Sequence, residues 1–122
     1  MKSALMLGVN PNAIREKNDF YATNPHALEI AMPVFKDILH NNVWECACGQ
    51  GHLSEVLKNN GYNVNSTDLI DRGYGGVKNF LECDEIFEGD ILTNPPFKLA
   101  EQFVEKSFEL IDEGNYAIFF LK

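Results

Sequence analysis

Residues 43–57, VWECACGQGHLSEVL, contain the pattern that decides the fold. The apolar pair Val43-Trp44 is typical of a short buried strand, and the turn Gly49-Gln50-Gly51 leads into the helical spacing of residues 53–57. Glycine adopts backbone angles that other residues avoid, and its missing Cβ lets a ligand lie against the main chain. The first N–H groups of the helix then face that ligand. The stretch predicts a strand, a ligand-binding turn and a helix, although a G-x-G pair also occurs in purely structural turns.

Acidic residues stand at the ends of two expected strands. Glu45 ends the first, where its carboxylate can reach a cationic or hydroxyl group held over the turn. The second expected strand covers residues 62–67 and leads directly into Asp68. This position is close to the spacing at which doubly wound nucleotide-binding folds place their ribose-binding acid. An ordinary turn or helix-cap aspartate is the alternative for Asp68. Combined with the glycine turn, the spacing favours ribose binding.

A third apolar run, residues 90–97 (DILTNPPF), ends on a polar amide, two prolines and an aromatic ring. Its last four residues, Asn94, Pro95, Pro96 and Phe97, are the most specific signal in the chain. The alternative is a simple turn between a strand and a helix, with Asn94 before proline and Phe97 in the core. A simple turn does not account for the motif standing at a strand end beside a glycine turn and a ribose acid.

Taken together, these motifs resemble class I methyltransferases that use S-adenosylmethionine, in particular the adenine-N6 amino-methyltransferases of DNA found in phages and bacteria. The resemblance covers about residues 19–122 and rests on Glu45-x-x-x-Gly49-x-Gly51, Asp68, Asn94-Pro95-Pro96-Phe97 and residues 19–25 (DFYATNP). Enzymes acting on DNA, RNA and protein glutamine share the Asn-Pro-Pro-aromatic motif, which marks methylation of a planar nitrogen. Residues 20–25 and the motif order favour adenine over cytosine N4.

The resemblance implies S-adenosylmethionine as the cofactor and assigns two sets of site residues. In the family an aspartate commonly stands at the position of Asn79 and accepts a hydrogen bond from the cofactor's exocyclic amine; the side-chain oxygen of Asn79 can still accept that bond. The target amine would donate to the Asn94 side chain and the Pro95 carbonyl group, while Phe97 stacks on the flipped base. The implied cofactor-binding residues are Phe20, Tyr21, Thr23, Glu45, Gly49, Gly51, Asp68 and Asn79, and the implied catalytic residues are Asn94, Pro95, Pro96 and Phe97.

The expected fold class is α/β, a doubly wound Rossmann-like methyltransferase sheet with strand order 3-2-1-4-5 that lacks the last two strands of the family. A helix is expected from residue 25 to about 31, with Pro33 breaking or kinking it. The third strand is expected to end at residues 79–81, and a helix is expected over residues 98–112. The apolar run 116–121 predicts a buried fifth strand whose free edge is an association hazard.

Residues 1–18 are expected to form a loosely packed lead-in to a partial methyltransferase domain, residues 19–122. The net charge is −8, from 18 acidic and 10 basic residues, so contact with DNA is expected to be local or supplied by a partner. A C-terminal partner chain or a homo-oligomer is expected to cover the last strand. The absence of a bilayer-length apolar run indicates a cytoplasmic protein.

Two other classes of function fit these residues less well than a methyltransferase. Zinc binding is disfavoured because C-x-C-x3-H (Cys46, Cys48, His52), with Cys83 as a fourth ligand, is not a common zinc spacing. A nicotinamide dehydrogenase is disfavoured because Ser54 stands where G-x-G-x-x-G requires its third glycine. We therefore expect no metal site, and a non-catalytic fragment or subunit that binds S-adenosylmethionine stays open as an alternative.

Overall fold

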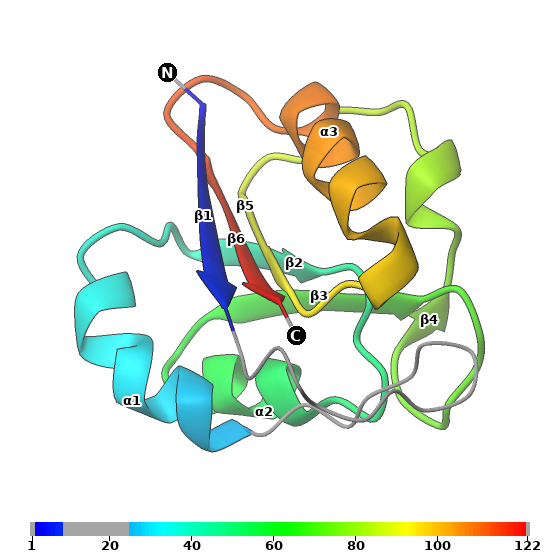
Figure 1. Cartoon of the computed structure of the whole chain (residues 1–122). Coiled ribbons are helices and arrows are strands. Elements are labelled where there is room, and N and C mark those ends of the chain that lie inside the picture. Colours follow the sequence, from blue (N-terminus) through cyan, green and yellow to red (C-terminus); the bar gives the residue numbers. More distant parts are fainter. Residues whose placement is uncertain (1, 9–24, 122) are drawn as a thin grey trace.

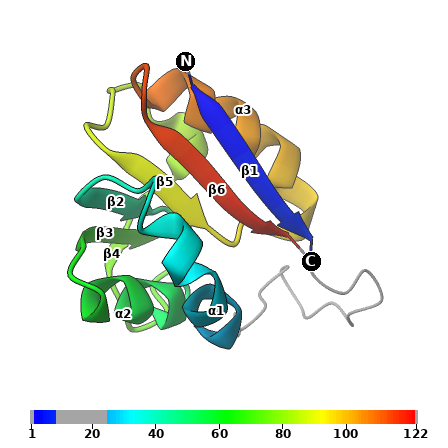
Figure 2. The same cartoon turned by 90° about the vertical axis from the view of Figure 1, so that its left-hand side faces the viewer.

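The computed structural model describes residues 2–8 and 25–121, which form one six-stranded sheet with helices on both faces (Figures 1 and 2). All neighbouring strands are parallel, in the order β1-β6-β5-β2-β3-β4. The strands are β1 (Ser3–Gly8), β2 (Asn42–Glu45), β3 (Asn63–Asp68), β4 (Gly76–Val77), β5 (Asp90–Thr93) and β6 (Tyr116–Leu121). The helices are α1 (Pro25–Phe35), α2 (His52–Asn59) and α3 (Ala100–Leu110), with short 3-10 turns η2 (Phe80–Glu82) and η3 (Phe97–Leu99). The predicted Rossmann-like class and the order 3-2-1-4-5, formed by β4-β3-β2-β5-β6, are confirmed.

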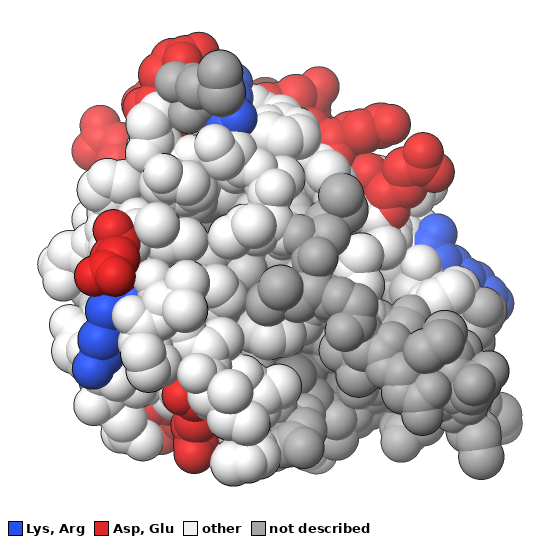
Figure 3. All heavy atoms as spheres, turned by 60° about the vertical axis from the view of Figure 1, so that its left-hand side comes forward, with Lys and Arg blue, Asp and Glu red and all other residues white. Residues whose placement is uncertain are grey.

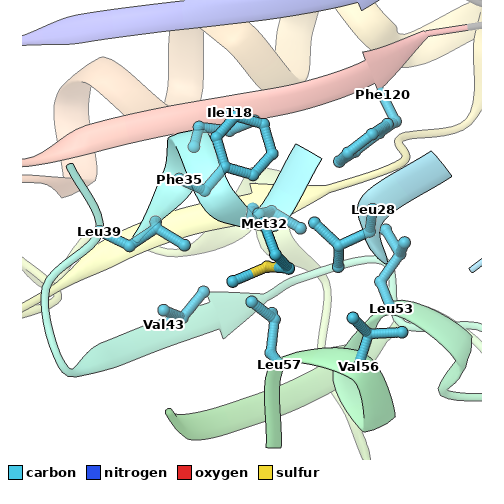
Figure 4. Close-up of a cluster of buried hydrophobic side chains, with 11 residues drawn as sticks. Leu28, Met32, Phe35, Leu39, Val43, Leu53, Val56, Leu57, Ile118 and Phe120 are labelled. Atoms are coloured by element: carbon cyan, nitrogen blue, oxygen red, sulfur yellow. The ribbon is translucent and has the colours of Figure 1, made fainter. Parts of the chain in front are cut away.

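The hydrophobic core has two parts, one on each face of the sheet. On the first face, α1 and α2 pack against β2, β5 and β6, and Figure 4 shows Met32 pointing among the side chains of both helices and the sheet. On the second face, α3 and η2 enclose Trp44 and Phe119, and the Phe80 ring stacks at a tilt on Phe103 with centroids 4.9 Å apart. Because both faces are covered, the central strands β5 and β6 are buried along most of their length.

Strand β1 corrects two of the expectations from sequence. Residues 3–8 do not belong to a loose lead-in; they pair in parallel with β6, from Ser3 opposite Tyr116 to Gly8 opposite Leu121. β6 therefore has a neighbour on each side, β1 and β5, and its edge is not free (Figure 2). The two outer strands of the described sheet are β1 and β4, so the reason for expecting a partner on the last strand no longer holds.

Helix α1 is longer than predicted: it does not end near residue 31 and continues through Pro33 to Phe35. A proline inside a helix removes one hydrogen bond and costs about 3 kcal/mol. Met32 and Phe35, on either side of Pro33, are buried in the core, whereas Pro33 itself is exposed. Burial of the two apolar side chains offsets the local cost, and the chain turns into β2 only after Leu39, whose N–H donates to the Phe35 carbonyl group at 2.8 Å.

The third strand lies earlier and is shorter than the sequence predicted. β4 contains only Gly76 and Val77, which pair with Thr67 and Asp68, and residues 80–82 form η2 instead of a strand. The connection from β3 to β4 holds no helix, and residues 69–75 fold over α2 instead.

Asp90 anchors the edge of the sheet where the strands begin. This residue is fully buried, and its carboxylate accepts hydrogen bonds from the backbone N–H groups of His40 and Tyr116 and from the Asn115 side-chain amide. The His40 ring nitrogen Nδ1 lies 3.1 Å from both carboxylate oxygens. One side chain therefore joins β5, the start of β6 and the segment before β2.

We expect Asp90→Ala to lower the free energy of unfolding by about 2 to 3 kcal/mol, because it leaves buried N–H donors without an acceptor. His40→Ala is the matched control: it removes only the histidine side chain, which is 54% exposed, so a loss below about 1 kcal/mol is expected. Urea unfolding of the two variants measures the difference. Equal losses would contradict the role assigned to Asp90.

Candidate functional site

The carboxyl ends of β2, β3 and β5 bring the predicted polar groups to one edge of the sheet. Glu45, Asp68 and Thr93 are the last residues of these three adjacent parallel strands. The loop after β2 contacts both neighbours, because the Cys48 N–H donates to the Thr67 carbonyl group at 2.9 Å and the Ala47 N–H donates to Thr93 Oγ1 at 3.1 Å. Ligands of open α/β sheets bind at this edge, next to the point where the strand order reverses.

Glu45 is the most strongly perturbed acid at this edge. Its side chain is 1% exposed, and Oε2 accepts hydrogen bonds from Thr93 Oγ1 at 2.7 Å and from the Ala47 N–H at 2.9 Å. Burial raises the pKa of Glu45 to about 8; the two hydrogen bonds oppose this rise, and the negative charge of Asp68 adds to it. The carboxyl group is therefore mostly protonated at neutral pH and is poised to ionise when a cation arrives.

Asp68 holds the glycine turn in place. Its Oδ2 accepts the Gly49 N–H at 2.9 Å, and its Oδ1 accepts the Ile70 N–H at 3.1 Å. Its main-chain carbonyl group accepts the Lys78 N–H at 2.8 Å, which places Asn79 next to this strand end. Arg72 Nε lies 3.9 Å from Oδ1. A carboxylate has about four acceptor positions, so Asp68 retains capacity for further donors such as ligand hydroxyl groups.

Tyr74 covers part of the glycine turn. Gly51 has a φ of +89°, and a Cβ built on it would lie 2.5 Å from the Tyr74 ring. The Tyr74 hydroxyl group donates to Glu55 at 2.6 Å and accepts from Lys58 Nζ at 2.7 Å, so the ring is tied to α2. The space that glycine leaves at position 51 therefore receives this tyrosine, whereas the sequence had suggested a ligand there.

Asn79 precedes η2 and caps it. Its Oδ1 accepts the Leu81 N–H at 3.1 Å, and its Nδ2 donates to Glu82 Oε1 at 3.0 Å. The amide oxygen has a second lone pair, which is compatible with a further hydrogen bond from a ligand amine. Asn79 also lines a hollow of about 460 Å³ between Trp44, Asn65 and residues 82–87.

The motif after β5 borders a cavity at the same edge of the sheet. A volume of about 280 Å³ is lined by Asn94, Pro95, Phe97, Lys98, Ala100, Glu101 and Leu121. Phe97 is 42% exposed. The alternative of a simple turn expected this residue in the core, and it does not lie there. The volume is close to the lower limit of ligand pockets, about 300 Å³, and the opening presents an amide beside an aromatic ring.

Sequence and structure agree unevenly on the site residues. Asp68 contacts Gly49 directly, whereas Glu45 is hydrogen-bonded to Thr93, the residue before Asn94. Phe20, Tyr21 and Thr23 lie outside the described residues. Neither Thr93 nor the packing of Tyr74 was predicted, although a hydroxyl residue in an apolar strand beside the motif was a signal for Thr93.

No helix in residues 2–8 and 25–121 has the length and apolar character to cross a bilayer. Within the same ranges, no group of three or more His, Cys, Asp or Glu side chains is placed to hold a metal ion.

Burial raises the pKa values of Cys46 and Cys48, so both thiols are neutral near pH 7.

Comparison with solved structures supports a methyltransferase-like fold. A protein of Pyrococcus horikoshii, PH1948, provisionally described as an RNA methyltransferase, superposes with a TM-score of 0.56 and 20% identity over 71% of this chain and 52% of its own. Protein 1320 of Thermoplasma acidophilum gives a TM-score of 0.54 and 21% identity over 70% of this chain and 55% of its own. The chain thus spans about half the length of these structures. No family model and no curated protein sequence matches it.

Proposed function

We propose that this chain binds S-adenosylmethionine and transfers its methyl group to the exocyclic N6 of adenine in DNA. One observation carries the proposal: the motif after β5 lines a cavity with Asn94, Pro95 and Phe97, at the sheet edge that also carries Glu45 and Asp68. A cofactor site and an amine-presenting motif on adjacent strand ends are what methyl transfer to nitrogen requires. The methyltransferase-like fold supports the same reaction class.

The strand ends suit the groups of this cofactor. Asp68 accepts hydrogen bonds from ribose hydroxyl groups, and Asn79 accepts one from the adenine amine. Glu45, once ionised, pairs with the cofactor's ammonium group, and the Gly49 turn lets the chain approach closely. The sulfonium of the cofactor supplies an activated methyl group, so these residues have only to bind and orient it.

The target nitrogen needs presentation because its lone pair is shared with the purine ring. The two amine N–H groups donate to Asn94 Oδ1 and the Pro95 carbonyl group, which localises the lone pair and aims it at the methyl carbon. Pro95 and Pro96 restrict the backbone that sets this geometry. Phe97 stacks on the base, which has left the duplex, and such stacking contributes about 1 to 3 kcal/mol.

Contact with DNA is local in this proposal. The chain carries a net charge of −8, and on the face shown in Figure 3 the Lys and Arg atoms appear in separate spots, two of which adjoin Asp or Glu atoms. Lys98 lines the cavity beside Phe97 and is the basic group best placed to contact a phosphate next to a flipped base.

Calorimetric titration with S-adenosylmethionine tests the cofactor half of the proposal. We expect one-to-one binding, weakened roughly 10- to 100-fold in Asp68→Ala, because hydrogen bonds to a charged group contribute about 1.5 to 3 kcal/mol. Asp71→Ala is the control: Asp71 is exposed in the following loop and accepts only the Gly73 N–H among the interactions described. A folded wild-type chain that binds neither S-adenosylmethionine nor its demethylated product would refute the proposal.

The substrate half is tested by incubating the protein and cofactor with unmethylated DNA, RNA and a glutamine-containing protein substrate. Mass spectrometry should detect N6-methyladenine in the DNA. Methylation of RNA or glutamine alone would assign the same chemistry to another target. Cofactor binding without transfer to any substrate would instead favour a non-catalytic binding subunit.

A further inference from the structure

Thr93 joins the two halves of the candidate site. This residue is fully buried at the end of β5, and its hydroxyl group donates to Glu45 Oε2 at 2.7 Å while accepting the Ala47 N–H at 3.1 Å. The Ala47 N–H also donates to Glu45 Oε2 at 2.9 Å, which closes a triangle of three polar groups. The hydroxyl group therefore links the loop after β2 to the end of β5.

The triangle joins β2 and β5 beyond the last pair of residues at which the two strands pair in the sheet. The parallel register between β2 and β5 runs from Val43 opposite Asp90 to Trp44 opposite Ile91. Beyond that pair the two strand ends are held by the contact between Glu45 and Thr93. Because Asn94 follows Thr93 directly, any shift of Thr93 moves the amide that borders the cavity.

We propose that Thr93 is a positioning residue that holds the Glu45 carboxyl group and fixes the location of Asn94, and so couples cofactor binding to presentation of the target amine. The inference rests on the function proposed above, in which Glu45 pairs with the cofactor's ammonium group. Valine has nearly the same shape as threonine and would fill this buried position without a polar group, so a requirement for packing alone does not call for the hydroxyl group.

The groups around Glu45 determine how strongly the hydroxyl group acts. Burial and the negative charge of Asp68 oppose ionisation of Glu45, and the hydrogen bonds from Thr93 and the Ala47 N–H favour it. The Cys46 and Cys48 thiols, also near this carboxyl group, are neutral because burial raises their pKa values. Removing the hydroxyl group takes away the leading interaction that favours the carboxylate, so Glu45 should ionise at higher pH.

The test is calorimetric titration with S-adenosylmethionine from pH 5.5 to 8.5 on the wild type, Thr93→Val and Thr93→Ser. In the wild type, affinity should rise with pH along an acid limb that reports ionisation of Glu45. Thr93→Val should move this limb upward and weaken binding about tenfold at pH 7. Thr93→Ser retains a hydroxyl group and should restore the wild-type profile, which a purely packing role would not explain.

Glu45→Gln supplies the matched background. The amide does not titrate, so Thr93→Val added to Glu45→Gln should move no acid limb. The inference is overturned if the wild type binds and Thr93→Val shows the same pH profile as the wild type. If Thr93→Val does not fold, a Thr93→Ser profile that differs from the wild type overturns it. A wild type that binds at no pH would refute the proposed function itself, so the two failures are distinguishable.

Discussion

Between pH 5 and pH 8 the free energy of unfolding should fall by on the order of 3 kcal/mol because of Glu45 alone. The pKa of this carboxyl group is about 8 in the folded chain and 4.5 in the unfolded reference. In this pH window the native state retains a proton that the unfolded state has lost, so raising the pH favours unfolding. The contribution is fully present below the unfolded value and is lost as the pH passes through the folded value.

The control for this prediction is Glu45→Gln, because an amide of the same shape does not titrate. Urea unfolding at pH 5, 6, 7 and 8 gives the stability of both proteins, and subtracting one curve from the other removes the effect of other titrating groups. The stability advantage of the wild type over Glu45→Gln should shrink steadily with pH. A constant difference would show that Glu45 is already ionised at neutral pH.

Replacing Asn94 by alanine should lower the rate of methyl transfer to adenine about 10²- to 10³-fold, as removal of a positioned transition-state hydrogen bond does in other enzymes. The amine then loses the acceptor that localises its lone pair. Affinity for S-adenosylmethionine should stay within about threefold, because Asn94 borders the substrate cavity and the cofactor contacts come from other strand ends. Single-turnover kinetics with unmethylated DNA measures the rate.

Glu101→Gln is the control for Asn94→Ala. Glu101 lines the same cavity but is exposed, and it has no part in presenting the amine, so its rate should stay within about threefold of the wild type. If Asn94→Ala transferred methyl groups at the wild-type rate, the motif would be structural. Equal losses in both variants would point to damage of the cavity as a whole.

The two buried carboxyl groups illustrate how the opposite edges of the sheet differ. Asp90, where the strands begin, accepts two main-chain N–H groups and a side-chain amide and interacts with His40. Glu45, where the strands end, receives two donors, both on the same oxygen. We infer that the first arrangement serves stability and that the second keeps a group ready for a ligand, a division common at sheet edges that bind ligands.

Local pattern predicted most of the central sheet. The apolar runs that became β5 and β6, the glycine turn before α2 and the strand ending on Asp68 all lie where the sequence indicated. Each of these elements satisfies its own periodicity and is bounded by its own turn residues, so few long-range contacts were needed to identify them. The alternation of strands and helices then predicted a doubly wound sheet with the order β4-β3-β2-β5-β6, which brings Glu45, Asp68 and Asn94 to one edge.

The sequence by itself thus determined the fold class, the order of the central strands and the edge where the polar motifs gather. Only the tertiary structure decided that residues 3–8 pair with β6, that α1 runs through Pro33, and that Tyr74 covers Gly51. It also showed that Thr93 binds the Glu45 carboxyl group. Each of these depends on a partner distant in sequence: a strand 113 positions away for Ser3, core side chains around Met32, Gly51 for Tyr74, and a carboxylate 48 residues from Thr93. The free energy of such contacts outweighs the local helix and strand propensities, and it cannot be read from a local sequence pattern.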